Sequence, residues 1–196
     1  MSINRQLIKS NAKVALKNNY WPFLGIMLLI GVIVSACSVT CIGAILVMPV
    51  IAIGYEYYVY RFYKQEDVTL ANSFDGFKKF GHVLGGWWYM YLFTFLWTLL
   101  FIIPGIVKGY AYSMTPYILM EEPELSVQDA LKKSMAMTKG HKWEMFVFDL
   151  SFLGWIILSC FTCGILMIFY VAPYYTIARA GIYDNLKAIE NGSAEA

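Results

Sequence analysis

Charged residues along this chain are confined to short polar segments that alternate with long apolar ones. No Asp, Glu, Lys or Arg occurs between Asn18 and Tyr55, and residues 83–107, 109–120 and 150–178 are likewise uncharged. An uncharged apolar run of about 18 residues or more is typical of a transmembrane helix, because the bilayer core cannot solvate a charge. The pattern therefore predicts a polytopic membrane protein.

The apolar residues form three blocks, at 20–63, 82–120 and 143–184. Each block is about twice the length that one helix needs to cross the hydrocarbon core of roughly 30 Å. Small residues interrupt the first block at 35–43 and the third at 159–164, and a Pro104-Gly105 turn is expected in the second. We predict an all-α polytopic membrane helix bundle of about six transmembrane helices in three hairpins. It forms one domain, 1–196, with hairpin units at 1–64, 65–121 and 122–196.

A polar segment precedes each hairpin, at 2–17, 69–81 and 126–139. In the first, cations recur every four residues, and Ile3, Leu7, Ala12 and Leu16 are expected to form an apolar face. In the second, phenylalanines recur every three residues (Phe74, Phe77 and Phe80). Ser126 and Asp129 open the third like a capping box. Each segment predicts a short interfacial helix whose cations contact lipid headgroups; a solvated connecting helix is the alternative. The headgroup-contacting cations are expected to be Arg5, Lys9, Lys13, Lys17, Lys78, Lys79, Lys132 and Lys133.

The first and third units share further detail. Thr40-Cys41 matches Thr162-Cys163, and Pro49 and Pro173 then fall at nearly equivalent places. This favours a degenerate three-fold repeat, with chance similarity between apolar segments as the alternative. In the six-span arrangement every Lys and Arg except Lys108 lies on one side, so the positive-inside rule places both termini in the cytoplasm.

Several passages carry a family resemblance. They are 15–21, 101–119, with its Ile-Pro-Gly-Ile-Val-Lys-Gly-Tyr core, Lys-Gly-His-Lys-Trp at 139–143, 150–155 and 171–174. Together they resemble an uncharacterised family of bacterial integral membrane proteins, domain-of-unknown-function family 975. The resemblance implies a small polytopic protein and no established activity, substrate or cofactor. The cysteines, which fall at the expected outer ends of the first and third hairpins, are not part of the family pattern.

Charges inside the expected spans are the first candidates for chemistry, because they are costly there. Glu56, Asp149 and Arg179 fall at similar depths and are predicted to form an intramembrane polar cluster. That cluster is either a site for a proton, cation or anion, or a structural ion pair with snorkelling side chains. Lys108 follows Pro104-Gly105 by about one turn, and is either a cation snorkelling to the outer headgroups or one facing an external anion.

The four cysteines, Cys37, Cys41, Cys160 and Cys163, all fall at expected external tips. Small apolar packing, disulfides and a metal site are the alternatives, and no His or acidic residue beside them supports a metal. We therefore expect no metal and no cofactor. The sequence contains no phosphate-binding loop, serine-hydrolase elbow or zinc-protease helix, so an enzyme is not expected.

The sequence thus predicts a non-enzymatic integral protein of the bacterial cytoplasmic membrane that binds lipid, a small amphiphile or a membrane partner. A small secondary transporter using Glu56, Asp149 and Arg179 is one alternative. An accessory or immunity protein against membrane-active peptides is another. The expected partners are membrane lipids and a second copy or another membrane protein, and not nucleic acid.

Overall fold

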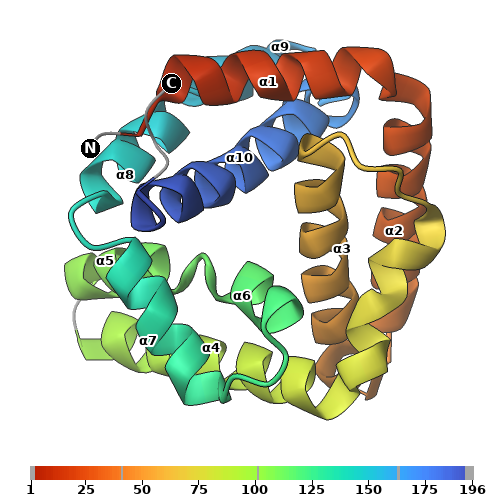
Figure 1. The fold of residues 1–196 in the computed structure, drawn as a ribbon. Helices are drawn as coiled ribbons and strands as arrows, with labels where there is room; N and C mark the ends of the chain where they lie inside the picture. Colours follow the sequence, from red (N-terminus) through yellow and green to blue (C-terminus); the bar gives the residue numbers. More distant parts are fainter. Residues whose placement is uncertain (1–2, 41, 101, 163, 193–196) are drawn as a thin grey trace. The chain divides into compact units, whose positions relative to one another are not determined.

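The chain folds into helices joined by short turns. The computed structural model describes residues 3–40, 42–100, 102–162 and 164–192, and every regular element in these ranges is a helix (Figure 1). The first six elements are α1 (Arg5–Asn18), α2 (Tyr20–Ser38), the π-helix η1 (Gly43–Val47), α3 (Met48–Tyr63), the 3₁₀ helix η2 (Leu70–Lys79) and α4 (Phe80–Leu100). The others are α5 (Ile102–Tyr112), α6 (Thr115–Glu121), α7 (Val127–Met137), α8 (Lys142–Leu150), α9 (Leu153–Phe161), the π-helix η3 (Met167–Val171) and α10 (Ala172–Glu190).

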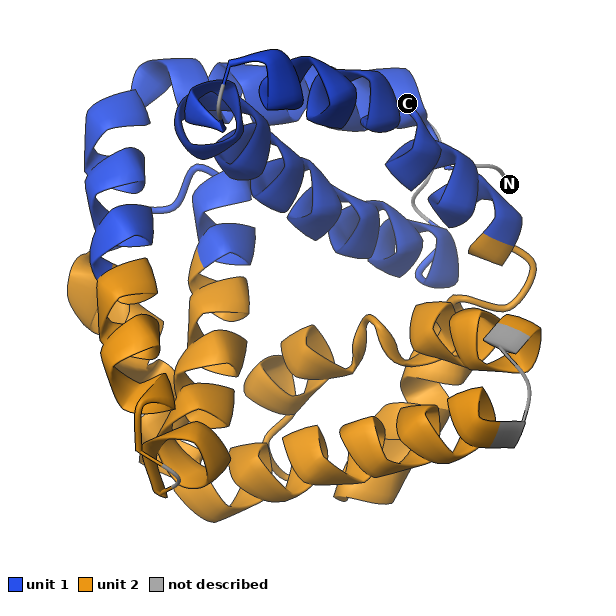
Figure 2. Ribbon diagram, turned by 180° about the vertical axis from the view of Figure 1, so that it is seen from behind, with its two compact units in different colours: residues 1–29, 59–68, 143–196 blue, residues 30–58, 69–142 orange. Residues whose placement is uncertain are grey.

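These helices form two compact units, each assembled from separated stretches of sequence (Figure 2). Unit 1 contains residues 1–29, 59–68 and 143–196, and unit 2 contains 30–58 and 69–142. Their boundaries do not follow the three consecutive hairpins of the sequence. In unit 1 the first and last helices of the chain are packed together.

The core of unit 1 forms where α1 lies along α10. Ile8 of α1 is 1% exposed, and the buried side of α10 is equally apolar. Gly181 lets the helices approach closely, because a Cβ there would lie 2.9 Å from Ile8 Cγ2 and 2.7 Å from the Tyr63 ring. The N-terminus is held against α8 by a hydrogen bond from Ile3 N–H to Glu144 Oε2.

The core of unit 2 is built on the α4–α5 hairpin, with α6 and α7 packed against it. Ala111, Tyr112 and Leu131 are buried together there. The Ser134 hydroxyl on α7 donates to the Ala111 carbonyl at 2.8 Å. The 126–139 segment is therefore packed on the second hairpin along its length.

The structure confirms two of the three expected helix breaks. The first apolar block is two helices separated after Ser38, and the third is interrupted after Phe161, where Gly164 has φ +81°. The second expectation is wrong in position, because Pro104 and Gly105 lie in the first turn of α5 and not between helices. Proline is tolerated in a first turn because its missing N–H has no intrahelical partner there.

Three helical stretches are long and apolar enough to cross a membrane, which indicates membrane association. They are Tyr20–Ser38, Gly43–Tyr63 and Lys142–Phe161. The expected fourth span is instead divided at Ser113 into α5 and α6, of 11 and 7 residues. The Lys142–Phe161 stretch is divided in the same way, at Ser151, into α8 and α9. The six-span topology is therefore not confirmed.

All three polar segments that precede the hairpins contain helices. Ser126 caps α7 by accepting a hydrogen bond from Asp129 N–H, as its capping pattern predicts. Phe74 and Phe77 lie on η2, and Phe80 begins α4. Three residues per 3₁₀ turn place the three rings in one row, with successive ring centroids 6.4 and 6.2 Å apart. A phenylalanine at every third position thus matches the 3₁₀ period.

Candidate functional site

A cavity of about 180 Å³ in unit 2 combines two lysines with apolar walls. Lys78 and Lys79 come from the end of η2, and Leu119 and Met120 from α6. The remaining lining residues are Tyr57, Asp75 and Pro123. Ammonium groups beside an aliphatic and aromatic surface can hold the charged end of an amphiphile.

Two glycines position the lysine-bearing helix directly on α3. A Cβ on Gly54 would lie 2.4 Å from the Ser73 carbonyl oxygen, and a Cβ on Gly76 would lie 2.6 Å from the Val50 carbonyl oxygen. Real Cβ atoms do not approach backbone so closely, so only glycine permits this packing at both positions. The cavity therefore depends on backbone contact between η2 and α3.

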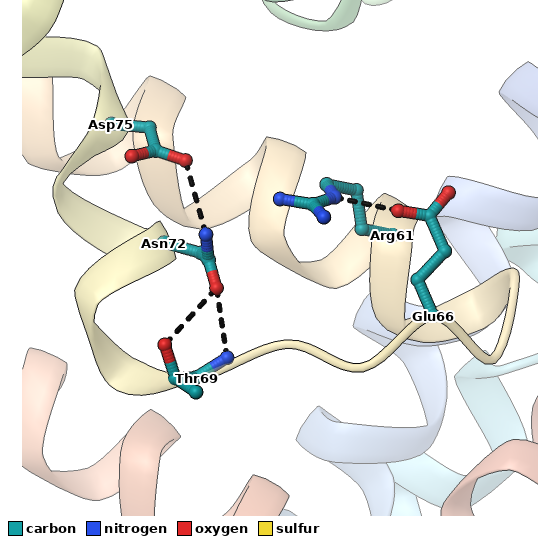
Figure 3. Close-up of polar contacts among 5 residues, drawn as sticks. All are labelled: Arg61, Glu66, Thr69, Asn72 and Asp75. Carbon is teal, nitrogen blue, oxygen red and sulfur yellow. Dashed lines mark hydrogen bonds and ion pairs between the residues drawn. The ribbon is translucent and has the colours of Figure 1, made fainter.

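A chain of side-chain hydrogen bonds organises η2 beside the cavity (Figure 3). The Asn72 amide oxygen accepts from Thr69 N–H at 2.8 Å, and its amide nitrogen donates to Asp75 Oδ2 at 3.3 Å. Asp75 Oδ1 in turn lies 2.7 Å from Lys78 Nζ. Lys78 is thus placed by a carboxylate that is itself held by the start of η2. Figure 3 also shows the Arg61–Glu66 ion pair of unit 1, at 2.6 Å.

The second lysine is held more loosely. Lys79 Nζ lies 3.2 Å from Glu124 Oε1, and the Glu124 side chain is 95% exposed. An exposed ion pair contributes about 0–1 kcal/mol. A ligand anion can therefore replace Glu124 at Lys79 at little cost.

The helices around this cavity also contain buried polar atoms without hydrogen-bond partners among the described residues. They are the hydroxyls of Tyr55, Ser73 and Thr115, and His82 Nε2. The first three belong to α3, η2 and α6, which wall the cavity, and His82 lies on α4, which continues directly from η2. A buried unsatisfied polar group costs about 1–3 kcal/mol. These four residues are not among those that line the cavity.

The three residues predicted to form an intramembrane polar cluster belong to different units: Asp149 and Arg179 to unit 1 and Glu56 to unit 2. In unit 1 the Tyr175 hydroxyl donates to Asp149 Oδ1 at 3.1 Å and accepts from Arg179 Nη1 at 3.3 Å. Asp149 and Arg179 thus lie close together, as the sequence predicts, and the Tyr175 hydroxyl between them was not predicted. Glu56 is half-buried on α3 and belongs to unit 2.

Lys108 occupies an aromatic environment in unit 2. Its Nζ lies 5.0 Å from the centroid of the Trp97 ring and 5.8 Å from that of Tyr112. The Met135 sulfur of α7 is 3.8 Å away. The six-span prediction places Lys108 near the outer surface and 126–139 at the inner one, whereas the structure has the two in contact.

The cations of α1 divide between two environments. Lys9 Nζ donates to Ser151 Oγ at 2.6 Å and lies 4.8 Å above the Phe152 ring, while Lys13 lies over Tyr174. Burial lowers the pKa of Lys9, and the positive charges of Arg5 and Lys13 lower it further. Arg5 and Lys17 are exposed.

The apolar face that the sequence predicts for the first segment also differs from the observed one. The prediction groups Leu7 with Ile3, Ala12 and Leu16, but Leu7 is 42% exposed and Ile8 is buried instead. The packing of α1 on α10 selects this face.

The remaining predicted residues lie apart from the cavity lining. Lys132 pairs with Asp129 at 3.0 Å, and Lys133 pairs with Glu122. Cys37 and Cys160 are free thiols, and Cys41 and Cys163 lie outside the described residues. Within the described ranges no three His, Cys, Asp or Glu side chains gather as a metal site.

Sequence reasoning identified Lys78 and Lys79 but missed the rest of the cavity. Tyr57, Leu119 and Met120 have no local signal, since they lie in apolar stretches far apart in the chain. Gly54 and Gly76 were the available hint, because isolated glycines in helical segments often mark close approach of another backbone.

The fold and the cavity define the chain as an all-helical protein with helices of membrane-spanning length and a cationic, partly apolar pocket. It belongs to the family described as protein of unknown function (DUF975), whose model matches residues 90–190. No curated protein and no solved structure matches the chain.

Proposed function

We propose that this protein is a non-enzymatic, multi-pass protein of the bacterial cytoplasmic membrane, with both termini in the cytoplasm, that binds an anionic amphiphile. The ligand's charged headgroup lies against Lys78 and Lys79, and its apolar part against Leu119 and Met120. The observation that carries the proposal is the cavity itself, which two lysine side chains line together with apolar residues.

The dimensions favour a headgroup over an entire ligand. Pockets that enclose a drug-sized molecule typically hold about 300–1,000 Å³, whereas this cavity holds about 180 Å³. A phosphate or carboxylate with a few attached carbons fits that volume, and the acyl chains remain in the bilayer. An anionic membrane lipid such as phosphatidylglycerol meets both requirements.

Native mass spectrometry of the purified protein tests the proposal directly. The wild-type chain in mild detergent is titrated with phosphatidylglycerol and, separately, with zwitterionic phosphatidylethanolamine. Each lysine near an anionic group contributes about 1 kcal/mol, so Lys78→Ala with Lys79→Ala should weaken phosphatidylglycerol binding by about 30-fold. Phosphatidylethanolamine binding should be weak in both proteins.

The control is Lys64→Ala with Lys132→Ala, which removes the same charge from exposed lysines that do not line the cavity. It should retain wild-type affinity. Equal loss in both double variants would mean that binding follows net charge alone, and no loss in either would rule out the cavity as the headgroup site.

A second candidate function, a small secondary transporter, is favoured by the Asp149–Tyr175–Arg179 contacts. A hydroxyl between a carboxylate and a guanidinium can change partner as the carboxylate gains or loses a proton. Reconstituted vesicles with a pH-sensitive dye inside test this. Asp149→Asn should abolish proton-coupled uptake if the protein is a transporter, while leaving phosphatidylglycerol binding at Lys78 and Lys79 unchanged.

A further inference from the structure

Two helices of the chain depart from regular α-helical hydrogen bonding in the same way. The π-helices η1 and η3 each end two residues before a proline, Pro49 and Pro173. Met48 N–H bonds to the Gly43 carbonyl and Ala172 N–H to the Met167 carbonyl, five residues back and not four. π-helical turns are rare, and they are frequent at functional sites.

Each proline removes one backbone N–H from the helix, and an aromatic side chain donates to a carbonyl in the turn that precedes it. In a regular α-helix the carbonyl that loses its donor lies four residues before the proline, and in π-helical register it lies five before. The carbonyls four residues before the prolines are those of Ile45 and Phe169. Trp88 Nε1 donates to the Ile45 oxygen at 3.0 Å, and the Tyr20 hydroxyl donates to the Phe169 oxygen at 2.6 Å.

The two sites also begin alike. The Thr40 hydroxyl donates to the carbonyl three residues back and accepts from Gly43 N–H at 3.1 Å. The Thr162 hydroxyl donates to the Ser159 carbonyl, three residues back, at 3.1 Å, and accepts from Leu166 N–H, four residues on, at 3.2 Å. A threonine turn, a π-helix, a proline and an aromatic donor to a carbonyl thus recur in the same order in two parts of the chain.

The energetic need for the caps follows from the surroundings. The side chains of Ile45 and Phe169 are 48% and 43% exposed on apolar helices. In hydrocarbon no water can satisfy a freed carbonyl, so a neighbouring helix must supply the donor. The donors come from other hairpins, Trp88 from α4 and Tyr20 from α2.

We propose that residues 43–49 and 167–173 are two matched bending points, each latched by an aromatic hydrogen-bond donor. While the aromatic side chain donates its hydrogen bond, the angle between the helical segments before and after each proline is fixed. When that hydrogen bond breaks, the carbonyl must accept from another donor, and the helix bends at the π-helix. Trp88 and Tyr20 are positioning residues for these arms, independently of the Lys78–Lys79 cavity.

Amide hydrogen exchange of the full-length protein in lipid nanodiscs tests the latches. Tyr20→Phe removes only the donor oxygen, and should raise exchange within 167–174 by about tenfold while leaving 43–50 unchanged. Trp88→Phe should do the reverse. Tyr91→Phe, on α4 beside the Trp88 ring, is the matched control and should alter neither segment.

Restoring the missing backbone N–H tests whether Trp88 and Tyr20 act through their hydrogen bonds or only through packing of their rings. Alanine at Pro49 or Pro173 gives the freed carbonyl a donor within its own helix. Adding Tyr20→Phe to Pro173→Ala should therefore raise the exchange rate within 167–174 by less than about twofold, relative to Pro173→Ala alone. Adding Trp88→Phe to Pro49→Ala should likewise have little effect on the exchange rate within 43–50. Equal increases with and without the proline would overturn the proposal, as would no increase in either single variant. If the tryptophan variant does not fold, the tyrosine series decides alone.

Discussion

The hydroxyl of Tyr175 donates a hydrogen bond to Asp149 Oδ1 over 3.1 Å, from α10 to α8. The same oxygen accepts from Arg179 Nη1 at 3.3 Å. One phenol therefore connects two oppositely charged side chains of unit 1 that are far apart in the sequence. Because both charges depend on this contact, their substitutions should not act independently.

We predict that Asp149→Ala destabilises the protein by about 1–3 kcal/mol, because a hydrogen-bonded charge loses its partner. Combining it with Arg179→Ala should cost less than the sum of the single changes, by a coupling of about 0.5–3 kcal/mol. Thermal unfolding in detergent measures all three variants, with Tyr175→Phe as a test of the bridging hydroxyl. Strict additivity would show that the two charges are not coupled.

Gly76→Ala should destabilise unit 2 by about 1–3 kcal/mol, as overpacking does. Its new Cβ would lie 2.6 Å from the Val50 carbonyl oxygen, which is backbone and cannot rotate away. Gly85→Ala on α4 is the control, because nothing lies within 4 Å of that Cβ. Alanine is the better helix former by about 1 kcal/mol, so Gly85→Ala should raise the melting temperature. An unchanged or higher melting temperature for Gly76→Ala would contradict the packing of η2 on α3.

Cross-linking should join Lys108→Cys to Met135→Cys, since Lys108 Nζ and Met135 Sδ are 3.8 Å apart. The four native cysteines are first replaced by serine, and a short bifunctional maleimide is applied to intact membranes. Gln128→Cys replaces Met135→Cys in the control, because it lies on the same helix about 10 Å along the axis from Met135. No linking of Lys108→Cys to either position would favour the six-span arrangement, in which Lys108 and α7 lie on opposite sides.

The carboxyl group of Asp129 should titrate below the ordinary value. A hydrogen bond from Ser126, then a hydrogen bond and the positive charge of Lys132, lower its pKa. A lowered folded-state pKa contributes stability that is present above the unfolded value of about 3.9 and is lost as pH falls through the folded pKa. The start of α7 should therefore fray in acid below that range.

Carbon-detected NMR of the Asp129 carboxyl measures this pKa. Ser126→Ala and Lys132→Ala should each raise it, because each removes an interaction that lowers the pKa, the serine hydrogen bond being the largest single cause. An unchanged pKa in Ser126→Ala would show that the helix cap does not stabilise the carboxylate.

Several local features of the fold follow from the sequence pattern. The break after Ser38, the cap at Ser126 and the helical polar segments result from residue size, capping chemistry and spacing. The turn expected at Pro104 was wrong because the same residue suits either a turn or a first helical turn. The spacing of the phenylalanines matches the 3₁₀ period of three residues per turn. A 3₁₀ helix was nevertheless not predicted for η2, because 3₁₀ runs beyond 3–4 residues are rare.

The sequence by itself determined the helical class, the membrane-length apolar stretches, the breaks after Ser38 and Phe161 and the cap at Ser126. These depend on hydrogen bonding and transfer free energies that act within a few residues. Only the tertiary structure decided which side of α1 is buried, where the Lys108 ammonium lies, and that Tyr175 joins Asp149 to Arg179. It also decided the cavity, since Tyr57, Lys78 and Leu119 come together only when η2 packs on glycine. Such contacts are pairwise and long-range, and no local pattern specifies them.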